Sequence, residues 1–369
     1  METQFFLATS WDDLLIIKLS MLNNLYSGRK ITEIYGSFPI SVTGSGRPAY
    51  RLPPVSFEHA VRHVSLAHEQ GIKFNYLMNA PDFDGQENDR QWVKKVINFV
   101  ARLDKEIKVD SLTIAHPFLI RLVKEKFPHL KVYLSLIAGV ATLKKAKEYE
   151  AMGVDLVYLN PHTINRNFDR LIGIAEKIKV PIGLYANIPC LSACPHRDTH
   201  YQFFGQASRS GIEDKFPLDP FIVRCSLIYL TDPVQLLRSP FIRPEDITEY
   251  QKMGIKIFKL SDRSESTAFL LETADAYLSG HYHSDLFKLI FRGGNKFKTG
   301  IKNLYPEVEN LPVPIMINND QLTELNFFSR LRSLSGRKLN EFYREATQKC
   351  VSHESAVLEK LKELLEKNC

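Results

Sequence analysis

The sequence lacks the features of a membrane or secreted protein. No run of about twenty apolar residues is present, so no segment is long enough to cross a bilayer as a helix. The N-terminal stretch "METQFFLATSWDDLL" has no basic segment leading into a long apolar one, unlike a signal peptide. We therefore expect a cytoplasmic protein that does not bind membranes.

Cysteine is scarce, and the excess of positive charge is small. The chain has 5 cysteines among its 369 residues, an odd number that does not suit a disulfide scaffold. We expect a reducing compartment, in which clustered thiols serve metal binding or catalysis. The net charge of +6 is compatible with an anionic substrate or with RNA, but it is too small to indicate either.

What the sequence does contain is a regular alternation of short apolar runs and longer amphipathic ones. In residues 141–153, apolar positions recur every three residues, and Gly153 is placed to end the helix in a left-handed cap. The predicted strands are residues 5–9, 31–36, 73–80, 111–117, 131–139, 155–161, 181–189 and 255–262. The predicted helices are residues 56–71, 91–106, 141–153, 168–178, 243–254 and 266–280.

Strands that alternate with helices predict a parallel sheet, and about eight such units close a (β/α)₈ barrel. An open, doubly wound sheet is the rival fold, but it usually has a glycine-rich phosphate loop after an early strand. Gly44 and Gly46, in "VTGSGRPAY", lie in a proline-rich loop without that strand–turn–helix context. We therefore predict an α/β protein with a (β/α)₈ barrel, and a mobile loop at residues 42–50 over the barrel mouth.

Two segments depart from the alternation. A cysteine-bearing insertion, about residues 190–243, follows the seventh strand, and long irregular connections of this kind are often functional. After about residue 280 we predict a C-terminal extension, residues 281–369, with loops at 291–300 and 305–314 and a final amphipathic helix. We expect that helix to dock on the barrel, which occupies residues 1–280 with its insertion, or on a partner protein. Its apolar stripe is Val357, Leu358, Leu361, Leu364 and Leu365.

Polar residues at the predicted strand ends are candidate site residues, because reacting groups in such barrels gather there. As a set they are rich in amides and cations and poor in acids, which suits a neutral or anionic small substrate better than a magnesium phosphate site. We single out Asn160, Asn187, Lys259 and Arg263 as catalytic or binding candidates. The other strand-end candidates are Ser10, Trp11, Tyr35, Asn75, Asn79, His116, Ser135, His162, Tyr185 and Asp262.

Cys190 and Cys194 directly follow the seventh predicted strand, and Cys225 lies in the same insertion. We expect these three thiols to meet at the barrel mouth, where soft thiolates select zinc or an iron–sulfur cluster. His196 and His200 are candidates for the fourth ligand or for hydrogen bonds to the ligands.

The thiols have three other interpretations. Three ordinary buried cysteines would need no ligand at all. A structural zinc site usually shows two closely spaced ligand pairs, unlike this pattern. An S-adenosylmethionine radical enzyme would have a cysteine three residues after Cys194, where this chain has Arg197. Cys350 and Cys369 lie in or near the C-terminal helices and are left out of the site.

The stretch "NIPCLSACPHRDTHY", followed by "RCSLIYL" and "FIRPEDITEYQKMGIKIFKLSDRSESTAFLLETADAYLSG", resembles the collagenase-like peptidase family, also called peptidase U32. In that family a lysine-containing strand, an arginine and a tyrosine-bearing helix end follow the cysteines, and here they match Lys259, Arg263 and Tyr277. The resemblance covers the chain to about Tyr282. The family usually has four cysteines and Lys-Ile-Glu-Gly-Arg, whereas this chain has three cysteines in the segment and "KLSDR".

Members of this family are associated with oxygen-independent hydroxylation of transfer RNA, ribosomal RNA and the ubiquinone ring. These reactions use a [4Fe–4S] cluster held by cysteines, with prephenate as the implicated oxygen donor. The resemblance thus implies that Cys190, Cys194 and Cys225 hold a [4Fe–4S] cluster, with zinc as the alternative metal. It implies hydroxylation, or a related modification, of a small molecule, a peptide or an RNA base, with Lys259, Arg263 and the asparagines orienting a small carboxylate co-substrate.

Two other functions remain open. The first is a peptidase, the activity for which the family is named. A cysteine peptidase would pair Cys194 as the nucleophile with His196 or His200 as the base. A zinc peptidase is not indicated, because the motif "H-E-x-x-H", which many zinc peptidases carry on a helix, is absent. The second is a non-catalytic barrel subunit that binds a partner protein. RNA is compatible with the charge but is not indicated by it.

Overall fold

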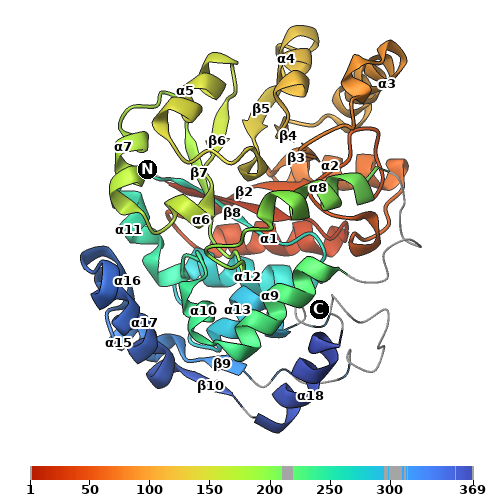
Figure 1. Cartoon of the computed structure of the whole chain (residues 1–369). Helices are drawn as coiled ribbons and strands as arrows, with labels where there is room; N and C mark the ends of the chain where they lie inside the picture. Colours follow the sequence, from red (N-terminus) through yellow and green to blue (C-terminus); the bar gives the residue numbers. More distant parts are fainter. Residues whose placement is uncertain are drawn as a thin grey trace.

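Eight parallel strands close into one barrel in this computed structural model, in the order β1-β2-β3-β4-β5-β6-β7-β8, with β8 pairing back onto β1 (Figure 1). The structure describes residues 2–209, 219–294, 298, 310, 313, 315–353 and 355–367. The strands are β1 (Thr3–Ala8), β2 (Arg29–Gly36), β3 (Lys73–Met78), β4 (Ser111–Ile114), β5 (Lys131–Leu134), β6 (Leu156–Tyr158), β7 (Ile182–Tyr185) and β8 (Ile257–Leu260). All eight overlap predicted strands, so the (β/α)₈ prediction is confirmed.

Helices form a layer around the barrel (Figure 1). They are α1 (Asp13–Leu25), α2 (Phe57–Glu69), α3 (Arg90–Arg102), α4 (Pro117–Lys126), α5 (Leu143–Ala151), α6 (Pro161–Ile164), α7 (Phe168–Ala175), α11 (Ile247–Lys252) and α12 (Thr267–Ser279). All six predicted helices are present, whereas α1, α4 and α6 were not predicted.

Local sequence explains how these helices begin, pack and end. Helix α3 begins after Asp89, whose carboxylate accepts a hydrogen bond from the backbone N–H of Gln91. Its buried residues Trp92, Val96 and Val100 are four apart, so they line one face toward the barrel. Gly153, just beyond α5, has φ of +83°, as predicted for a left-handed cap.

The insertion after β7 is largely helical rather than irregular, which corrects the expectation. Its described part contains α8 (Arg197–Ala207), α9 (Pro220–Thr231) and α10 (Val234–Arg238). Asp219 starts α9 by accepting hydrogen bonds from the backbone N–H groups of Phe221 and Ile222, and Pro220 suits the first helical position.

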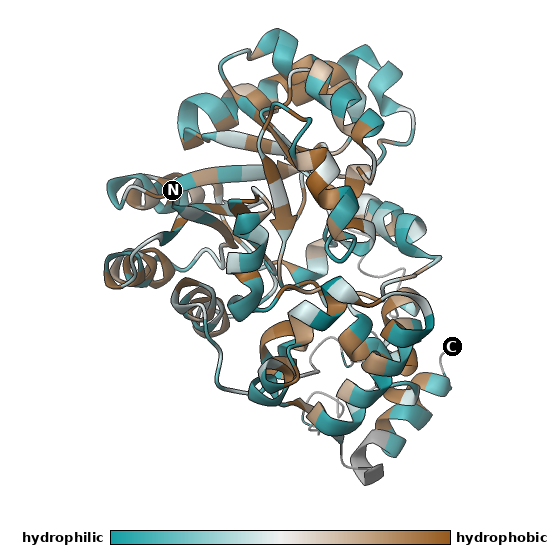
Figure 2. Cartoon of the chain, turned by 90° about the vertical axis from the view of Figure 1, so that its left-hand side faces the viewer, coloured by the Kyte–Doolittle hydropathy of each residue, from teal (hydrophilic) through white to brown (hydrophobic). Residues whose placement is uncertain are grey.

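The C-terminal extension forms a second layer beside the insertion. It contains α13 (Leu286–Phe291), β9 (Ile315–Ile317), α15 (Asn319–Glu324), α16 (Phe327–Ser333), α17 (Gly336–Cys350), β10 (Val351–His353) and α18 (Ser355–Glu366). Helix α18 packs on α9, and α17 packs on α10. The hydrophobic faces of these helices turn toward one another (Figure 2). The predicted loops at 291–300 and 305–314 lie mostly outside the described residues.

Within the described residues, no helix combines the length and the apolar character that crossing a membrane would require.

Candidate functional site

A pocket lies at the carboxyl ends of the barrel strands, between the barrel and the insertion. It is lined by Tyr35, Gly46, Arg47, Arg51, Leu77, Asn79, Leu136, Ile137, Tyr185, Ile188, Pro189, Cys190, Leu191, Cys194, Arg197, His200, Tyr201, Phe204, Phe221, Ile222, Cys225, Ser261, Asp262, Arg263, Glu265 and Arg292. We call it the cysteine–arginine pocket. Its position matches the end of the barrel at which enzymes of this fold carry their active sites.

The three predicted cysteines all line this pocket, although they come from different elements. Cys190 and Cys194 lie in the loop after β7 and are partly exposed, whereas Cys225 lies on α9 and is 8% exposed. The thiol of Cys225 donates a hydrogen bond to the carbonyl oxygen of Ile222 at 3.3 Å. The structure thus brings the thiols to one cavity, and their role as ligands stays a prediction.

The loop that bears Cys190 and Cys194 is held by Arg197. One guanidinium nitrogen of Arg197 donates to the carbonyl oxygens of Leu191 and Ser192, each at 3.0 Å. These carbonyls belong to residues between the two cysteines, so the bonds fix the conformation of the loop.

The spacing of the thiols bears on which metal they suit. In the described part of the chain, the three sulfurs do not form a group whose members all lie within 4.8 Å of one another. Three thiolates on one tetrahedral zinc ion would be about 3.8 Å apart, given Zn–S bonds of about 2.3 Å. In this structure the three sulfurs are therefore not spaced as three ligands of one zinc ion.

Of the two candidate histidines, His200 lines the pocket and His196 lies outside its lining in the described structure. His200 Nε2 is 3.3 Å from the Asp219 carboxylate, and its ring stacks on Phe221 with 4.9 Å between centroids. His200 is thus the better placed of the two to assist the thiols.

Positive charge dominates the pocket wall, where five arginines face two carboxylates. Arg47 forms a bidentate pair with Asp262, at 3.1 and 2.9 Å, and Arg292 pairs with Glu265 at 3.1 Å. Burial alone would raise the pKa of Asp262, but Arg47, Arg292 and Arg51 hold that pKa well below its usual range. An ionised Asp262 thus fixes Arg47, while the wall keeps a net positive charge.

Two other arginines face the cavity with few or no charged partners. Arg263 donates to the hydroxyls of Ser37 and Ser45, and burial, with repulsion from Arg47, lowers its pKa to about 10. The guanidinium of Arg51 makes no hydrogen bond to any residue that the structure describes. Burial also lowers the pKa of Arg51, because desolvation disfavours its charge. Arg51 is therefore the cation best placed to bind an anionic group of a ligand.

Lys259 does not line the pocket but lies beneath it, inside the barrel. Its ammonium group is 3.9 Å from the ring centroid of Tyr35 and 5.7 Å from that of Tyr185, and both tyrosines belong to the pocket wall. Burial lowers the pKa of Lys259 to about 7, partly offset by attraction to Glu33. Burial likewise raises the pKa of Glu33 to about 8, against the attraction of Lys259. The rings of these two tyrosines therefore lie between Lys259 and the cavity.

The predicted asparagines serve the scaffold of the site. Asn187 exchanges two hydrogen bonds with the backbone of Ser261, at 2.6 and 2.7 Å, and so ties the end of β7 to the end of β8. Asn160 caps α6 by accepting from the backbone N–H of His162 at 3.1 Å, and it does not line the pocket in the described structure. Tyr277 donates to the carbonyl oxygen of Ile242 at 2.7 Å.

The loop at residues 42–50 lies over the barrel mouth as predicted, but it is anchored. The backbone N–H of Gly46 donates to Asn79 at 2.9 Å, and that of Ser45 donates to Ser208 at 2.7 Å. A side chain on Gly46 would meet Ile137 at 2.7 Å, so glycine allows this close approach. The predicted position of the loop is confirmed, and its mobility stays a prediction.

The sequence did not predict most of the five arginines that line the pocket. Arg47 and Arg51 come from the loop after β2, and Arg292 from the end of α13. The signal for the first two is weak: two arginines four residues apart in a loop that follows a strand. No pattern in the sequence links Arg292 to the barrel.

Comparisons with known proteins place this architecture in a family. The family model for "Peptidase family U32" matches residues 50–179. An "Uncharacterized protease MJ1657" of Methanocaldococcus jannaschii is 31% identical over 259 residues, which are 70% of this chain and 75% of that protein. The "tRNA hydroxylation protein P" of Haemophilus influenzae is 29% identical over 122 residues, 31% of this chain and 25% of that protein.

A solved structure is similar in fold. "The Structure of the U32 Peptidase Mk0906" superimposes with a TM-score of 0.52 and 18% identity, covering 71% of this chain and 93% of that one. At this identity the likeness concerns the fold alone. The similarity to the M. jannaschii protein extends over more than two thirds of both chains, and it agrees with the family match and the barrel. The chain therefore belongs to peptidase family U32.

Proposed function

We propose that this protein is an iron–sulfur enzyme that carries out an oxygen-independent hydroxylation, or a related modification, in the cysteine–arginine pocket. The observation that carries the proposal is the meeting of Cys190, Cys194 and Cys225 with a surplus of arginines around one cavity. The similarity to a protein named for tRNA hydroxylation supports the same chemistry.

The donor set fits the proposed cofactor. Three thiolates suit a [4Fe–4S] cluster, since soft sulfur ligands select such centres. His200 is the candidate for the fourth position, which otherwise stays open to an exogenous ligand. When bound, the cluster would supply an iron site for an oxygen-containing ligand.

The residues of this chain would bind and orient the co-substrate. Arg51 and Arg263 are placed to hold a carboxylate, because guanidinium groups bind carboxylates through charge-assisted hydrogen bonds. Tyr201 and Phe204 of α8 and Phe221 of α9 form an aromatic part of the wall that would hold the apolar body of the ligand. We propose prephenate, the oxygen donor that the family resemblance implies, as the carboxylate to test.

The overall reaction balances without molecular oxygen. A C–H bond of the substrate breaks and a C–O bond forms, while the hydroxylated carboxylic acid loses its C–O bond and gains a C–H bond. The substrate is oxidised by two electrons, and the carboxylic acid accepts them. The substrate itself is a small molecule, a peptide or an RNA base.

A cysteine hydrolase is the second candidate, and one observation favours it. His200 pairs with Asp219 in the wall that also contains the thiols, and a cysteine nucleophile needs a base that is oriented by a third group. The names of the M. jannaschii relative and of the similar structure also refer to proteolysis.

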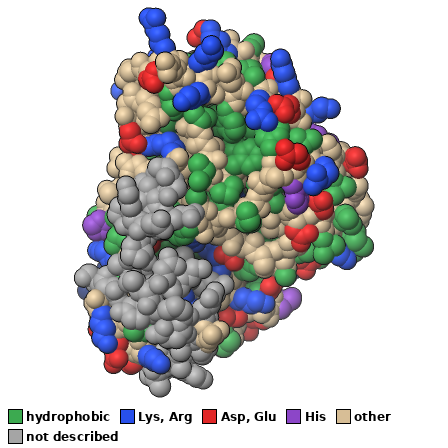
Figure 3. Space-filling model, turned by 90° about the vertical axis from the view of Figure 1, so that its right-hand side faces the viewer, with side chains coloured by type: hydrophobic (Ala, Val, Ile, Leu, Met, Phe, Trp, Pro, Cys, Tyr) green, Lys and Arg blue, Asp and Glu red, His purple; other side chains and the backbone are tan. Residues whose placement is uncertain are grey.

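A non-catalytic subunit that uses the final helix for docking has less support. Leu361 and Leu365 of α18 are 0% exposed and pack within the chain, because α18 lies on α9. These two residues of the apolar stripe are thus already covered. Binding to RNA gains no support from the face shown in Figure 3, where Lys and Arg side chains are interspersed with Asp and Glu rather than gathered in a stripe.

Anaerobic purification tests the proposal. The protein should be brown and should contain iron and acid-labile sulfide, and Cys190→Ala, Cys194→Ala and Cys225→Ala should each reduce both. Cys350→Ala is the matched control, because Cys350 is a buried cysteine on α17 that does not line the pocket. A colourless protein with stoichiometric zinc on the same thiols would favour the zinc alternative. A metal-free protein that cleaves peptides would favour the hydrolase.

A further inference from the structure

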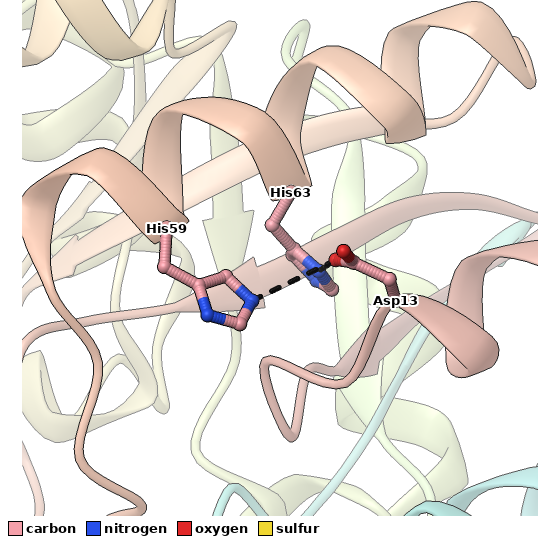
Figure 4. A group of neighbouring side chains, drawn as sticks. All are labelled: Asp13, His59 and His63. Carbon is pink, nitrogen blue, oxygen red and sulfur yellow. Dashed lines mark hydrogen bonds and ion pairs between the residues drawn. The ribbon is translucent and has the colours of Figure 1, made fainter.

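A second cluster of metal-binding side chains lies outside the cysteine–arginine pocket, at the joint between α1 and α2. It consists of Asp13, the first residue of α1, and of His59 and His63 on α2. The two histidines are four residues apart, so they share one face of the helix, and both imidazoles turn toward Asp13 (Figure 4). Residues distant in the sequence thus present three donor atoms to one point.

The distances in this cluster are those of ligands around one ion. One donor atom from each residue lies within 4.8 Å of the other two. The Asp13 oxygen is 2.7 Å from His63 Nδ1 and 3.7 Å from His59 Nε2. Nitrogen and oxygen ligands of a tetrahedral zinc ion lie about 3.3 Å apart, so these two separations differ from that spacing by about 0.6 and 0.4 Å.

The orientation of His63 is fixed in the way that metal-bound histidines are usually held. Its Nε2 is 2.7 Å from the hydroxyl oxygen of Thr9, and the side chain is 0% exposed. His63 Nδ1 lies within hydrogen-bond distance of Asp13 Oδ1, at 2.7 Å, so a bound ion would replace the proton between these two atoms while Nε2–H donates to Thr9. Histidine ligands commonly donate their other ring N–H to a neighbouring oxygen, which sets the tautomer and the ring orientation.

His59 supplies an independent observation. Its Nε2 atom is buried and has no hydrogen-bond partner among the described residues, although this nitrogen faces Asp13. The rest of the His59 side chain is 37% exposed, and that of Asp13 is 48% exposed. A buried, unsatisfied nitrogen costs free energy, and a bound ion would satisfy it while leaving a coordination position open to water.

We propose that Asp13, His59 and His63 bind one divalent transition-metal ion, with zinc as the reference ion, and that this ion ties α1 to α2. Two imidazoles with one carboxylate favour zinc and its neighbours over magnesium or calcium, which prefer oxygen ligands throughout. Because the ion binds the folded chain, it stabilises the first helices of the barrel. The site is independent of the cysteines and of the proposed hydroxylation.

Zinc stoichiometry in full-length variants tests the proposal. Chelator-treated protein is dialysed against a fixed concentration of free zinc, and the metal bound per chain is measured. His59→Ala and Asp13→Asn should each lose one equivalent relative to the unmodified chain. The matched control is His129→Ala, since His129 is exposed and paired with Asp104 at 3.0 Å. It should retain all the zinc.

Two further measurements separate this site from the thiols. Zinc should raise the melting temperature of the unmodified protein more than that of His59→Ala. The cobalt spectrum lost in His59→Ala should lack sulfur-to-cobalt charge transfer, which marks thiolate ligands. Equal zinc stoichiometry in all the variants would overturn the proposal, as would a lost cobalt spectrum with thiolate character. Both results would leave the cluster a hydrogen-bonded joint, and neither would affect the iron and sulfide assay of the cysteines.

Discussion

At the scale of single residues, Lys259 and Glu33 form the most unusual pair in the barrel. The Lys259 side chain is 0% exposed, and its ammonium nitrogen has no hydrogen-bond partner among the described residues. It lies over the rings of Tyr35, Tyr158 and Tyr185 instead. Cation–π contacts and attraction to Glu33 replace only part of the lost hydration, which explains the lowered pKa.

This pair predicts a specific dependence of stability on pH. Because the pKa of Lys259 is about 7 in the folded protein and 10.5 in the ordinary side chain, the unfolded chain binds more protons between these values. Stability contributed by Lys259 is therefore gained as pH rises through this window. Between about pH 8.5 and 10, the free energy of unfolding of the unmodified protein should rise relative to that of Lys259→Met by about 1 kcal/mol per pH unit.

Urea unfolding at several pH values measures this difference. In Lys259→Met, Glu33 would lose the attraction of the cation and its pKa would rise further, so that variant would lose stability as pH rises and the difference would grow. Lys105→Met is the control, since Lys105 is exposed on the surface, and it should show no such slope. A constant difference across the pH range would contradict a buried amine with a lowered pKa.

Arg51 carries the prediction for ligand binding. Arg51→Ala should weaken the binding of prephenate by about tenfold to a hundredfold, as expected for the loss of a charged hydrogen bond of about 1.5–3 kcal/mol. The fold should be kept, because the guanidinium of Arg51 donates no hydrogen bond to the described residues, and its backbone N–H bond to Pro48 survives the substitution. Calorimetric titration measures the affinity, with Arg121→Ala on the exposed face of α4 as the control. Equal affinity in the two variants would remove Arg51 from the binding site.

What the sequence could predict at this scale depends on how rare the residue type is. With 5 cysteines in the chain, the group in one insertion stands out, and the structure does bring these thiols to one pocket. Arginine is common in the chain, and Arg47, Arg51 and Arg292 meet only because loops and a distant helix fold over the barrel. Asp13 and His63 are 50 positions apart, so only the tertiary structure joins them.

At the scale of elements, α9 connects the site to the end of the chain. It carries Cys225 on the side facing the pocket, and it packs against α18, whose Leu361 and Leu365 are fully buried. The position of Cys225 therefore depends on a helix more than a hundred residues further along the chain. The rigidity of α9 is needed if its thiol is to hold a metal centre together with the loop after β7.

Leu361→Ala tests this connection. The cavity left by the leucine should lower the free energy of unfolding by about 2–5 kcal/mol and should also reduce the iron and sulfide bound per chain. Lys360→Ala, an exposed position on the same helix, is the control and should change neither quantity. Reduced stability with full iron content would show that α18 supports the fold but not the site.

The accuracy of the element predictions follows from the strength of each pattern. The barrel strands are short, buried apolar runs between helices, and all were found. Helix α1 was missed because it has no polar face: Leu15, Ile16 and Leu19 are buried, while Leu14 and Ile17 are about half exposed. A helix that is apolar on both sides shows no 3.6-residue period. Helices α9 and α10 of the insertion pack on α18 and α17 of the C-terminal extension, a pairing that no local pattern in the sequence indicates.

At the scale of the whole molecule, the barrel, the insertion and the C-terminal extension build one site together. The barrel supplies Arg263, the insertion supplies the cysteines, and the segment after α13 supplies Arg292. Ring contacts such as that between Tyr229 on α9 and Phe291 on α13, with 5.3 Å between centroids, join the last two parts. The expected boundary at residue 280 is therefore crossed by the packing that surrounds the pocket.

Truncation at this boundary gives the last prediction. A chain of residues 1–280 would lose α13, whose five apolar residues from Leu286 to Phe291 are at most 1% exposed, and would lose the ion pairs of Arg292 with Glu265 and Asp262. Exposed apolar surface on α9 and α10 should make this chain aggregate or unfold without a cooperative transition.

A chain of residues 1–353, which lacks only α18, should keep a folded barrel and bind less iron. Size-exclusion chromatography, thermal unfolding and iron analysis compare them. If residues 1–280 form a stable monomer with full iron content, the barrel and its insertion build the site alone, and the C-terminal extension must serve another purpose.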